Sequence, residues 1–467
     1  MRKPFIFICI SVLCVAALSL LAGVSLAQDA EGEWQLTFSP ISKLLDNNDS
    51  FSRDDRFLVY DTRETFGGGI GNGTMIMKVS ISTGLENFVY APWPVLIGSQ
   101  AAPGLGAASY SPVDDVVVFI HGPLVSETAK LGFYGGTNRR GGVARADGSG
   151  DVGYLDCRDV QSEPTPPGAH RGGSHRHEFS ADGSRIGFTY DDALLTQYGR
   201  NIGYMVSHEK APCGVSFYAA LLAPVVPAAE SKPGDLERAA DDSWVGAKGL
   251  MRAFIGNVKE ADGKVMGSLF VVDIPENVDI TTAGSGTKTV YPSPPVGTRV
   301  RRLTTTPAGG IVRGSLDGTR IGYFANAADG SRQAFIINAQ GSDQHQDPAM
   351  RPVQVTTFEK GATGGLRWHP SGNSIAVISD GGVAAVCVKP GPLFGKTAWL
   401  TPRGAQIPAA DALVWSHNGK LLAYNRRVPT YNAAGALVKD SGGNDFRQIF
   451  LVRFPDKDGN GIADSVE

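Results

Sequence analysis

The sequence predicts an all-β fold: a β-propeller of seven blades, each a four-stranded antiparallel sheet. One phrase recurs along the chain, in which an aromatic or small residue and Ser or Pro precede an Asp-Gly or Asn-Gly turn and a short apolar strand. The 59 glycines fall at turn positions between short apolar runs and follow no three-residue period, which is typical of many short strands. Such blades cannot bury both faces alone, so we expect them to stack into a closed ring without free sheet edges.

The recurring phrase gives the order of the blades. Six copies place a turn before a strand: Phe51–Asp55 before Phe57–Tyr60, Tyr110–Pro112 before Val116–Ile120, Phe179–Gly183 before Ile186–Tyr190, Ser315–Gly318 before Ile321–Phe324, Trp368–Gly372 before Ile375–Ile378, and Trp415–Gly419 before Leu421–Tyr424. A Leu-Thr or Val-Thr dipeptide marks the end of the last strand of the preceding unit. These dipeptides begin at Leu36, Leu303, Val355 and Leu400. Seven is the expected number of blades, and six and eight are the alternatives.

A wide gap between the third and fourth copies predicts a further, degenerate blade. The gap contains two strand-like runs, Leu250–Ile255 and Ser268–Ile274. An Asp-Gly turn at Asp262 separates them, as in a hairpin.

Two long connections and the chain ends complete the predicted topology. Leu221–Asp242 is predicted as a surface excursion with a short helical turn at Leu236–Ala240. The segment Gly135–Gly173, rich in Gly, Arg and Pro, is predicted as a second long loop. Glu33–Phe38 is expected to pair with Gln448–Phe454 and so join the two chain ends in the last blade.

The first residues predict a secretory signal peptide over residues 1–27. Basic residues precede an apolar run from Phe5 to about Val24, and small residues lead to a cleavage point before Gln28. An uncleaved anchor is the alternative, because the run is nearly long enough to cross a bilayer. We therefore expect an exported protein, periplasmic or secreted, with no stable membrane span after cleavage, a propeller at 28–455 and a tail at 456–467.

Cleavage would leave three cysteines, Cys157, Cys213 and Cys387, in a compartment where disulfides persist. An odd number allows at most one bridge within the chain. Cys157 and Cys213 are the expected pair because they flank one section of sequence. Since such sparse cross-linking cannot hold the fold, a hydrophobic core must do so.

The repeats resemble the WD40-like (PD40) repeats of TolB-type periplasmic propellers, in which a Ser-Pro-Asp-Gly turn precedes a strand of the Ile-Ala-Phe kind. The stretch Arg171–Ser180, continuing to Phe188–Leu194, resembles more particularly an uncharacterised family of bacterial exported TolB-like propellers. The resemblance covers most of the mature chain. It implies the fold but no activity, because propellers include both binding proteins and enzymes.

A histidine cluster is the strongest candidate for a site. His170, His175 and His177 are three of the eight histidines in the chain and lie within one short stretch. On a strand, His175 and His177 would project to one side, a spacing that can place two imidazoles on one metal ion. Aligned on the turns, His177 replaces the apolar residues Leu366, Leu413 and Ala108 of other blades. These positions lie on the innermost strand, which borders the central channel.

Two interpretations of the cluster stay open. The first is a metal or anionic-ligand site, with Mn, Zn or Fe as the metal, whose ligands are His170, His175, His177 and His208, with Glu178 and Asp191 as outer partners. The second is a hydrogen-bonded polar lining around a water-filled channel.

A metal-binding, histidine-lined propeller resembles the oligogalacturonate lyases in architecture. That resemblance implies a divalent ion that acidifies and orients a uronate while a base abstracts a proton. His170 and Arg171 are available as a base and an arginine, but the ligands of the lyases do not match this chain residue by residue.

The acidic tail has the pattern of a calcium loop. The oxygen ligands of such a loop would come, in order, from Asp456, Asp458, Asn460, the carbonyl of Ile462, Asp464 and Glu467. The tail resembles EF-hand and thrombospondin type 3 loops, although a strand and not a helix precedes it. A solvated acidic turn is the alternative.

Composition narrows the function. The net charge of −3 and the absence of a long basic run argue against nucleic acid as a partner. The sequence contains no Gly-x-Ser-x-Gly elbow, the motif that would predict a hydrolase of the α/β class. We expect a monomeric binding module that takes a protein or glycan partner at one rim. The alternative is a metal-dependent polysaccharide lyase acting on acidic oligosaccharides, and the sequence leaves open whether the protein is an enzyme.

Overall fold

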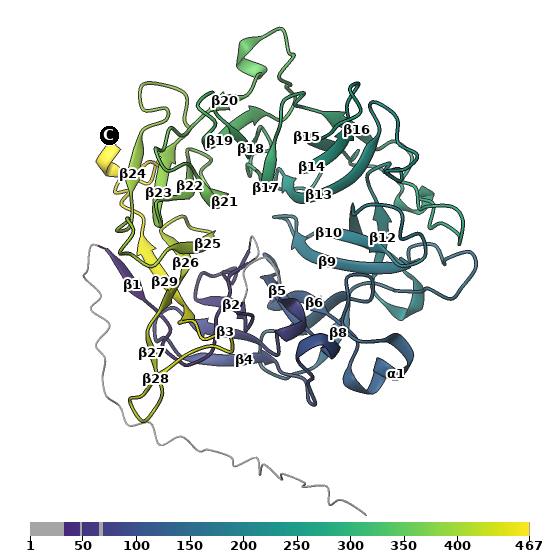
Figure 1. Ribbon diagram of the computed structural model, residues 1–467, viewed down its shortest axis with the longest axis horizontal. Helices are drawn as coiled ribbons and strands as arrows, with labels where there is room; N and C mark the ends of the chain where they lie inside the picture. Colours follow the sequence, from purple (N-terminus) through teal and green to yellow (C-terminus); the bar gives the residue numbers. More distant parts are fainter. Residues whose placement is uncertain (1–31, 47–48, 65–68, 467) are drawn as a thin grey trace, which may run out of the picture. The chain divides into compact units, whose positions relative to one another are not determined.

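The predicted strand–turn–strand units are present and stand around a common axis (Figure 1). The computed structural model describes residues 32–46, 49–64 and 69–466. Within these ranges the blades are seven antiparallel sheets, which confirms the all-β propeller and its blade number. The predicted signal peptide and Glu467 lie outside the described residues. No helix in the described ranges is long and apolar enough to cross a membrane.

Each blade runs outward from an inner strand that faces the axis. Blade 1 has three strands: β2 (Phe57–Asp61), β3 (Ile76–Ser80) and β4 (Glu86–Tyr90). Single bridges from Leu44 and Phe51 to β2 occupy its inner edge. Blade 2 consists of β5 (Leu105–Tyr110), β6 (Val116–His121), β7 (Arg140–Arg145) and β8 (Val152–Tyr154). Blade 3 consists of β9 (Gly172–Phe179), β10 (Arg185–Asp192), β11 (Asn201–Ser207) and β12 (Phe217–Leu221).

Blades 4 to 6 repeat this arrangement. Blade 4, the predicted degenerate blade, consists of β13 (Leu236–Val245), β14 (Met251–Lys259), β15 (Val265–Asp273) and β16 (Arg299–Arg302). Blade 5 consists of β17 (Gly309–Gly314), β18 (Arg320–Asn326), β19 (Arg332–Asn338) and β20 (Val353–Gln354). Blade 6 consists of β21 (Thr363–Trp368), β22 (Ser374–Ser379), β23 (Gly382–Cys387) and β24 (Thr397–Trp399).

Blade 7 joins the two ends of the described chain. It consists of β25 (Ala410–Trp415), β26 (Leu421–Val428), β29 (Phe446–Arg453) and, as its outer strand, β1 (Glu33–Gln35). Trp34 lies opposite Leu451 in this pairing, which confirms the predicted closure. The small hairpin of β27 (Thr430–Tyr431) and β28 (Leu437–Val438) extends from β26, and the short helix α1 (Thr128–Leu131) follows β6.

The recurring phrase forms the turn between the inner strand and the second strand. In blade 3 the Ser180 hydroxyl donates to the Asp182 carboxylate (2.7 Å) and accepts from the backbone N–H of Arg185 (3.0 Å). Gly183 has a φ of 72°, a left-handed conformation that glycine adopts without steric cost. The same serine, aspartate and glycine therefore recur because together they build one turn.

The core lies between neighbouring blades. Leu58 and Val79 of blade 1, for example, belong to one buried cluster with Val414 and Leu451 of blade 7. Such packing buries the two faces that a single blade cannot bury alone.

Two predicted connections are wrong. Leu236–Ala240 is not a helical turn but the start of β13, because Ala239 and Ala240 are buried and pair with β14. The segment Gly135–Gly173 is not one loop, because it contains β7 and β8. In both places tertiary pairing overrides local composition.

Candidate functional site

The predicted histidine cluster lies on and beside β9, the inner strand of blade 3. His175 and His177 belong to this strand, and His170 precedes it. All three side chains are buried, and His177 has no exposed surface. The cluster is therefore part of the wall between blades.

A β-bulge at Arg176 separates His175 from His177. Glu178 lies opposite Gly187 and His175 lies opposite Thr189, so β9 has one residue more than β10 over this interval. A bulge interrupts the alternation of side chains, so strand alternation does not place the two rings on one side. Five other inner strands have an irregular register with a positive φ, at Ala107, Asp241, Gly310, Gly364 and Ala412.

A buried carboxylate links His170 to His177. Asp156 has no exposed surface and forms a hydrogen bond with His170 Nε2 (3.0 Å). The Ser174 hydroxyl donates to the same carboxylate and forms a hydrogen bond with His177 Nε2 (3.1 Å). The four side chains thus form one hydrogen-bonded network between blades 2 and 3.

Within this network, the pKa values of Asp156 and His177 are both shifted downward. Burial alone would raise the pKa of Asp156, but attraction to His170 and the hydrogen bond from it lower that pKa to about 2. Burial lowers the pKa of His177 to about 4, although the Asp156 charge opposes this shift. At neutral pH, Asp156 is therefore ionised and His177 is neutral.

His175 belongs to a different group of charges. Its Nδ1 lies 3.8 Å from the Asp191 carboxylate. Asp191 also accepts hydrogen bonds from Arg139 (3.2 Å) and Arg200 (3.1 Å). Burial, followed by repulsion from these two arginines, holds the pKa of His175 well below its usual value. Asp191 is therefore committed to two guanidinium groups.

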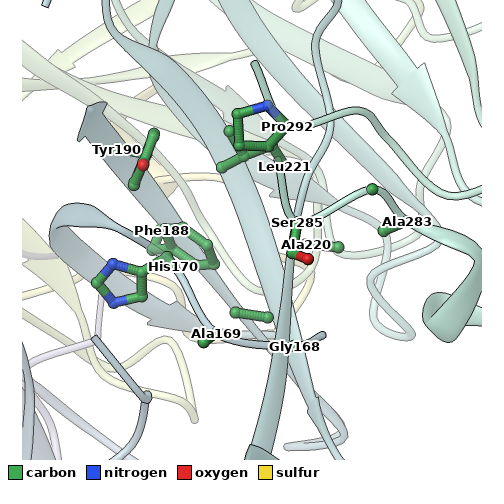
Figure 2. Close-up of a pocket in the computed structure, with 12 residues that line it drawn as sticks. Gly168, Ala169, His170, Phe188, Tyr190, Ala220, Leu221, Ala283, Ser285 and Pro292 are labelled. Carbon is green, nitrogen blue, oxygen red and sulfur yellow. The ribbon is translucent and has the colours of Figure 1, made fainter. Parts of the chain in front are cut away.

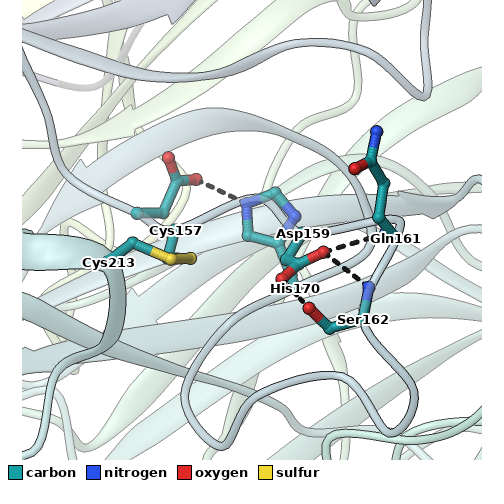
Figure 3. The surroundings of a disulfide bond; sticks show 7 residues. Cys157, Asp159, Gln161, Ser162, His170 and Cys213 are labelled. Carbon is teal, nitrogen blue, oxygen red and sulfur yellow. Dashed lines mark hydrogen bonds and ion pairs between the residues drawn. A yellow bond between two sulfur atoms is a disulfide. The ribbon is translucent and has the colours of Figure 1, made fainter.

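His170 lies next to the disulfide between Cys157 and Cys213, the bridge that the sequence predicts (Figure 3). Its backbone N–H donates to the Cys157 carbonyl (2.9 Å). A cavity of about 20 Å³ adjoins the ring and is lined by Phe188, Tyr190 and other residues (Figure 2). Such a volume holds about one water molecule and is too small for a substrate.

His208 lies apart from the other three histidines. It follows β11, where Val206 lies opposite Arg185, whereas His175 lies opposite Thr189 near the other end of β10. Among the described residues, no three His, Cys, Asp or Glu side chains are placed to hold a metal ion. Metal binding by the predicted ligands therefore stays a prediction.

A cavity of about 440 Å³ lies on the axis, and all seven blades contribute side chains to it. It lies where the inner strands end in their turns. Its lining includes Asp49, Pro112, Glu178, Trp244, Arg313, Arg367, Trp368, Trp415 and His417. We call it the axial cavity.

Tryptophans fix the inner strands around the axial cavity. The indole N–H of Trp244 donates to the carbonyl of Glu178 (2.9 Å), that of Trp368 to Arg313 (2.8 Å) and that of Trp415 to Arg367 (3.3 Å). Each bond joins one blade to the blade before it.

The histidines that line the axial cavity are His369 and His417, which the sequence analysis did not single out. The His417 ring contacts the carboxylates of Asp49 and Asp55 at 3.0 Å each. Burial alone would lower the pKa of His417, but hydrogen bonds to the two aspartates raise it to about 10. His417 is therefore a fixed positive charge that joins blade 7 to blade 1.

Glu178, predicted as an outer partner of a metal site, is committed elsewhere. Its carboxylate accepts from the Ser243 hydroxyl (3.0 Å) and from Arg252 Nη1 (3.2 Å). Arg252 also pairs with Asp242. Glu178 on β9 and Asp242 on β13, both inner strands, thus form buried ion pairs with Arg252 of β14.

The predicted calcium loop folds against blade 6. The Ser374 hydroxyl donates to the Gly461 carbonyl (2.6 Å), and Ile462 is buried. The Asp456 carboxylate accepts from the backbone N–H groups of Asn460 (3.0 Å) and Gly461 (2.8 Å). These contacts fix the loop within the protein, and its calcium binding stays a prediction.

Comparison with known sequences identifies relatives of this chain. Residues 104–217 match the family described as "Protein of unknown function (DUF3748)". The chain is 31% identical over 434 residues to "Uncharacterized protein YidR" of Escherichia coli strain K12. The aligned region covers 86% of this chain and 97% of that protein.

Comparison with solved structures supports the propeller fold. An oligogalacturonate lyase in complex with manganese aligns with a TM-score of 0.50 at 11% identity and covers 94% of this chain and 96% of that one. TolB from Acinetobacter baumannii aligns with a TM-score of 0.36 at 11% identity, and the alignment covers 88% of this chain and 85% of TolB. At such low identity the likeness to the lyase concerns the fold alone.

Proposed function

The chain belongs to the family of Escherichia coli YidR, and from this premise we propose that it is a binding module that takes a protein or glycan partner at the rim where the axial cavity opens. The single observation that carries this proposal is that all seven blades contribute side chains to that cavity. A rigid ring that presents turns around one hollow is a common way to build a recognition surface.

We propose further that the module works outside the cytoplasm as a monomer. The Cys157–Cys213 disulfide supports an oxidising compartment. The predicted signal peptide agrees with this location.

The proposed rim is tested by one substitution beside the cavity and one away from it. Leu316 lines the cavity and is 47% exposed, whereas Leu437 is 52% exposed on the β27–β28 hairpin. Glycan arrays and pull-downs from envelope extracts would compare the wild-type protein with Leu316→Glu and Leu437→Glu. A partner that binds at least ~10-fold more weakly to Leu316→Glu alone supports the rim. A partner that binds all three proteins equally overturns the location.

A metal-dependent lyase acting on acidic oligosaccharides is the second candidate. It is suggested by the oligogalacturonate lyase in complex with manganese, whose fold this chain shares. The described residues do not form a metal ligand set of three, so we derive no catalytic step for this candidate.

Elemental mass spectrometry and a product assay test the lyase. Manganese, zinc or iron near one equivalent, lost in the double variant His175→Ala/His177→Ala, would support a metal site at the cluster. Unsaturated sugars that absorb in the ultraviolet, formed from uronate oligosaccharides with added manganese, would support the lyase. Absence of both would leave the binding module.

A further inference from the structure

Three arginines lie on the inner strands of three different blades. Arg176 lies on β9, Arg313 on β17 and Arg367 on β21. Arg313 and Arg367 line the axial cavity, and their exposed fractions are only 2% and 5%. They occupy the same position of the repeat in adjacent blades, two residues before the start of the turn.

The guanidinium groups of these arginines have few partners. The structure records one hydrogen bond for each of two of them, from Arg313 Nη1 to the Val312 carbonyl (3.1 Å) and from Arg367 Nη1 to the Leu366 carbonyl (2.9 Å). Among the described residues no hydrogen-bond partner exists for Arg313 Nε and Nη2, Arg367 Nε or Arg176 Nη1. Buried donors without partners are rare, and an anion in the cavity would satisfy them.

Arg252 on β14 and Arg63 after β2 are also buried, but both form ion pairs. Arg252 pairs with Glu178 and Asp242. Arg63 pairs with Asp46 (2.6 Å) and Asp61 (2.7 Å). The carboxylates of Glu178, Asp242, Asp46 and Asp61 are therefore paired with other guanidinium groups. In the described part of the chain, no carboxylate lies within ion-pair distance of Arg176, Arg313 or Arg367.

The three charges also repel one another. Burial, followed by repulsion from Arg367 and Arg176, holds the pKa of Arg313 well below its usual value, although Glu178 and Asp242 oppose the shift. Burial and repulsion from Arg176 lower the pKa of Arg367 to about 10 against the attraction of Glu178 and Asp46. An arrangement that is costly without a counter-charge becomes favourable once an anion enters.

We propose that the axial cavity is an oxyanion-binding site in which Arg313 and Arg367 hold a carboxylate or phosphate group of the ligand and Arg176 adds positive charge. A guanidinium group presents a planar fork of N–H donors that matches both kinds of oxyanion. The cavity of about 440 Å³ lies within the size range of small-molecule sites, roughly 300–1,000 Å³. This inference rests on the proposed function, because it names the ligand chemistry of the same cavity.

Calorimetry at low ionic strength with three probes tests the site. Inorganic phosphate and glucuronate are the two oxyanions, and glucose is the neutral counterpart of glucuronate. Binding of glucuronate with no heat from phosphate assigns a carboxylate ligand, and the reverse assigns a phosphate ligand. Binding of glucose as tight as that of glucuronate, or no binding of either oxyanion at millimolar concentration, overturns the proposal.

Variants locate the site. Arg313→Gln and Arg367→Gln should each weaken oxyanion binding by about 10- to 100-fold, since each removes charged hydrogen bonds. Arg351→Gln is the matched control, because Arg351 is exposed, donates to the His345 carbonyl (2.6 Å) and does not line the cavity. Its effect should stay below about threefold, as for an exposed charge. Equal effects of the three substitutions would overturn the assignment.

Thermal unfolding without ligand separates a binding role from a structural one. Removal of an uncompensated buried charge should leave the melting temperature of Arg313→Gln equal to or above that of the wild-type protein. A lower melting temperature in both Arg313→Gln and Arg367→Gln would mean that these arginines hold the fold, which contradicts the proposal.

The two proposals can fail separately. If the rim captures a partner in a Leu316-dependent way but neither oxyanion binds, the oxyanion site is wrong and the binding module stands. If glucuronate or phosphate binds in an Arg313-dependent way but no partner is captured, the oxyanion site stands and the larger rim partner is wrong.

Discussion

At the scale of single residues, buried neutral histidines make the stability of the propeller depend on pH. Burial lowers the pKa of His177 from 6.5 to about 4. Between these two pH values the unfolded chain binds a proton that the folded chain does not, so stability is fully present above the unfolded pKa and falls as the pH drops toward the folded one.

The variant His177→Gln should therefore flatten the pH dependence of unfolding. Urea unfolding at about pH 7 and about pH 5 should show a stability loss for the wild-type protein that exceeds the loss for the variant by about 2 kcal/mol. His345→Gln, in the loop before η6 (Pro348–Met350), is the control and should behave like the wild-type protein. Equal losses in the wild-type protein and His177→Gln would show that His177 is not kept neutral by the fold.

The sequence was sufficient to find the histidine cluster but not its geometry. Alternation along a strand predicts that His175 and His177 share a side, yet the extra residue at Arg176 breaks that alternation. Nothing local marks this bulge, because arginine rarely adopts its φ of 54°. The arginines of the axial cavity were missed for a related reason: Arg313 and Arg367 gain their meaning from neighbours in other blades.

At the scale of elements, the tail loop gives a second prediction. We expect calcium to bind it in the millimolar range typical of extracellular modules and to raise the melting temperature, because the loop is anchored on blade 6 through Ser374. Calorimetry with millimolar calcium measures this, with magnesium as the competing ion. The double variant Asp456→Asn/Asp458→Asn should abolish the heat, and a wild-type protein that gives none identifies the tail as an acidic turn.

The turn of blade 3 could be predicted from its own residues, whereas the strand β13 could not. The Ser180–Gly183 turn contains its own hydrogen bonds, so its sequence is sufficient to identify it. The strand β13 begins with helix-favouring residues and has a bulge at Asp241. Pairing with β14 makes it a strand, and that pairing is not visible in a single segment.

At the scale of the whole molecule, stability depends on the blade that both ends build. Leu36 follows β1, is 1% exposed, and donates its backbone N–H to the Ile449 carbonyl (2.8 Å). Leu36→Ala should lower the free energy of unfolding by about 2–5 kcal/mol, as for a buried leucine.

Thermal and urea unfolding measure this effect, with Leu85→Ala as the matched control because Leu85 is 62% exposed. The control should change the free energy of unfolding by less than about 0.5 kcal/mol. A Leu36→Ala effect no larger than that of the control would mean that the ring does not depend on its closing strand.

The blade-to-blade tryptophans also make the protein its own optical reporter. Three of the six tryptophans, Trp244, Trp368 and Trp415, line the axial cavity. A ligand that enters changes the polarity and quenching around these indoles, so intrinsic fluorescence follows occupancy without a label. Replacing Trp93, which is 88% exposed, by phenylalanine would remove the solvent-exposed background and sharpen that signal.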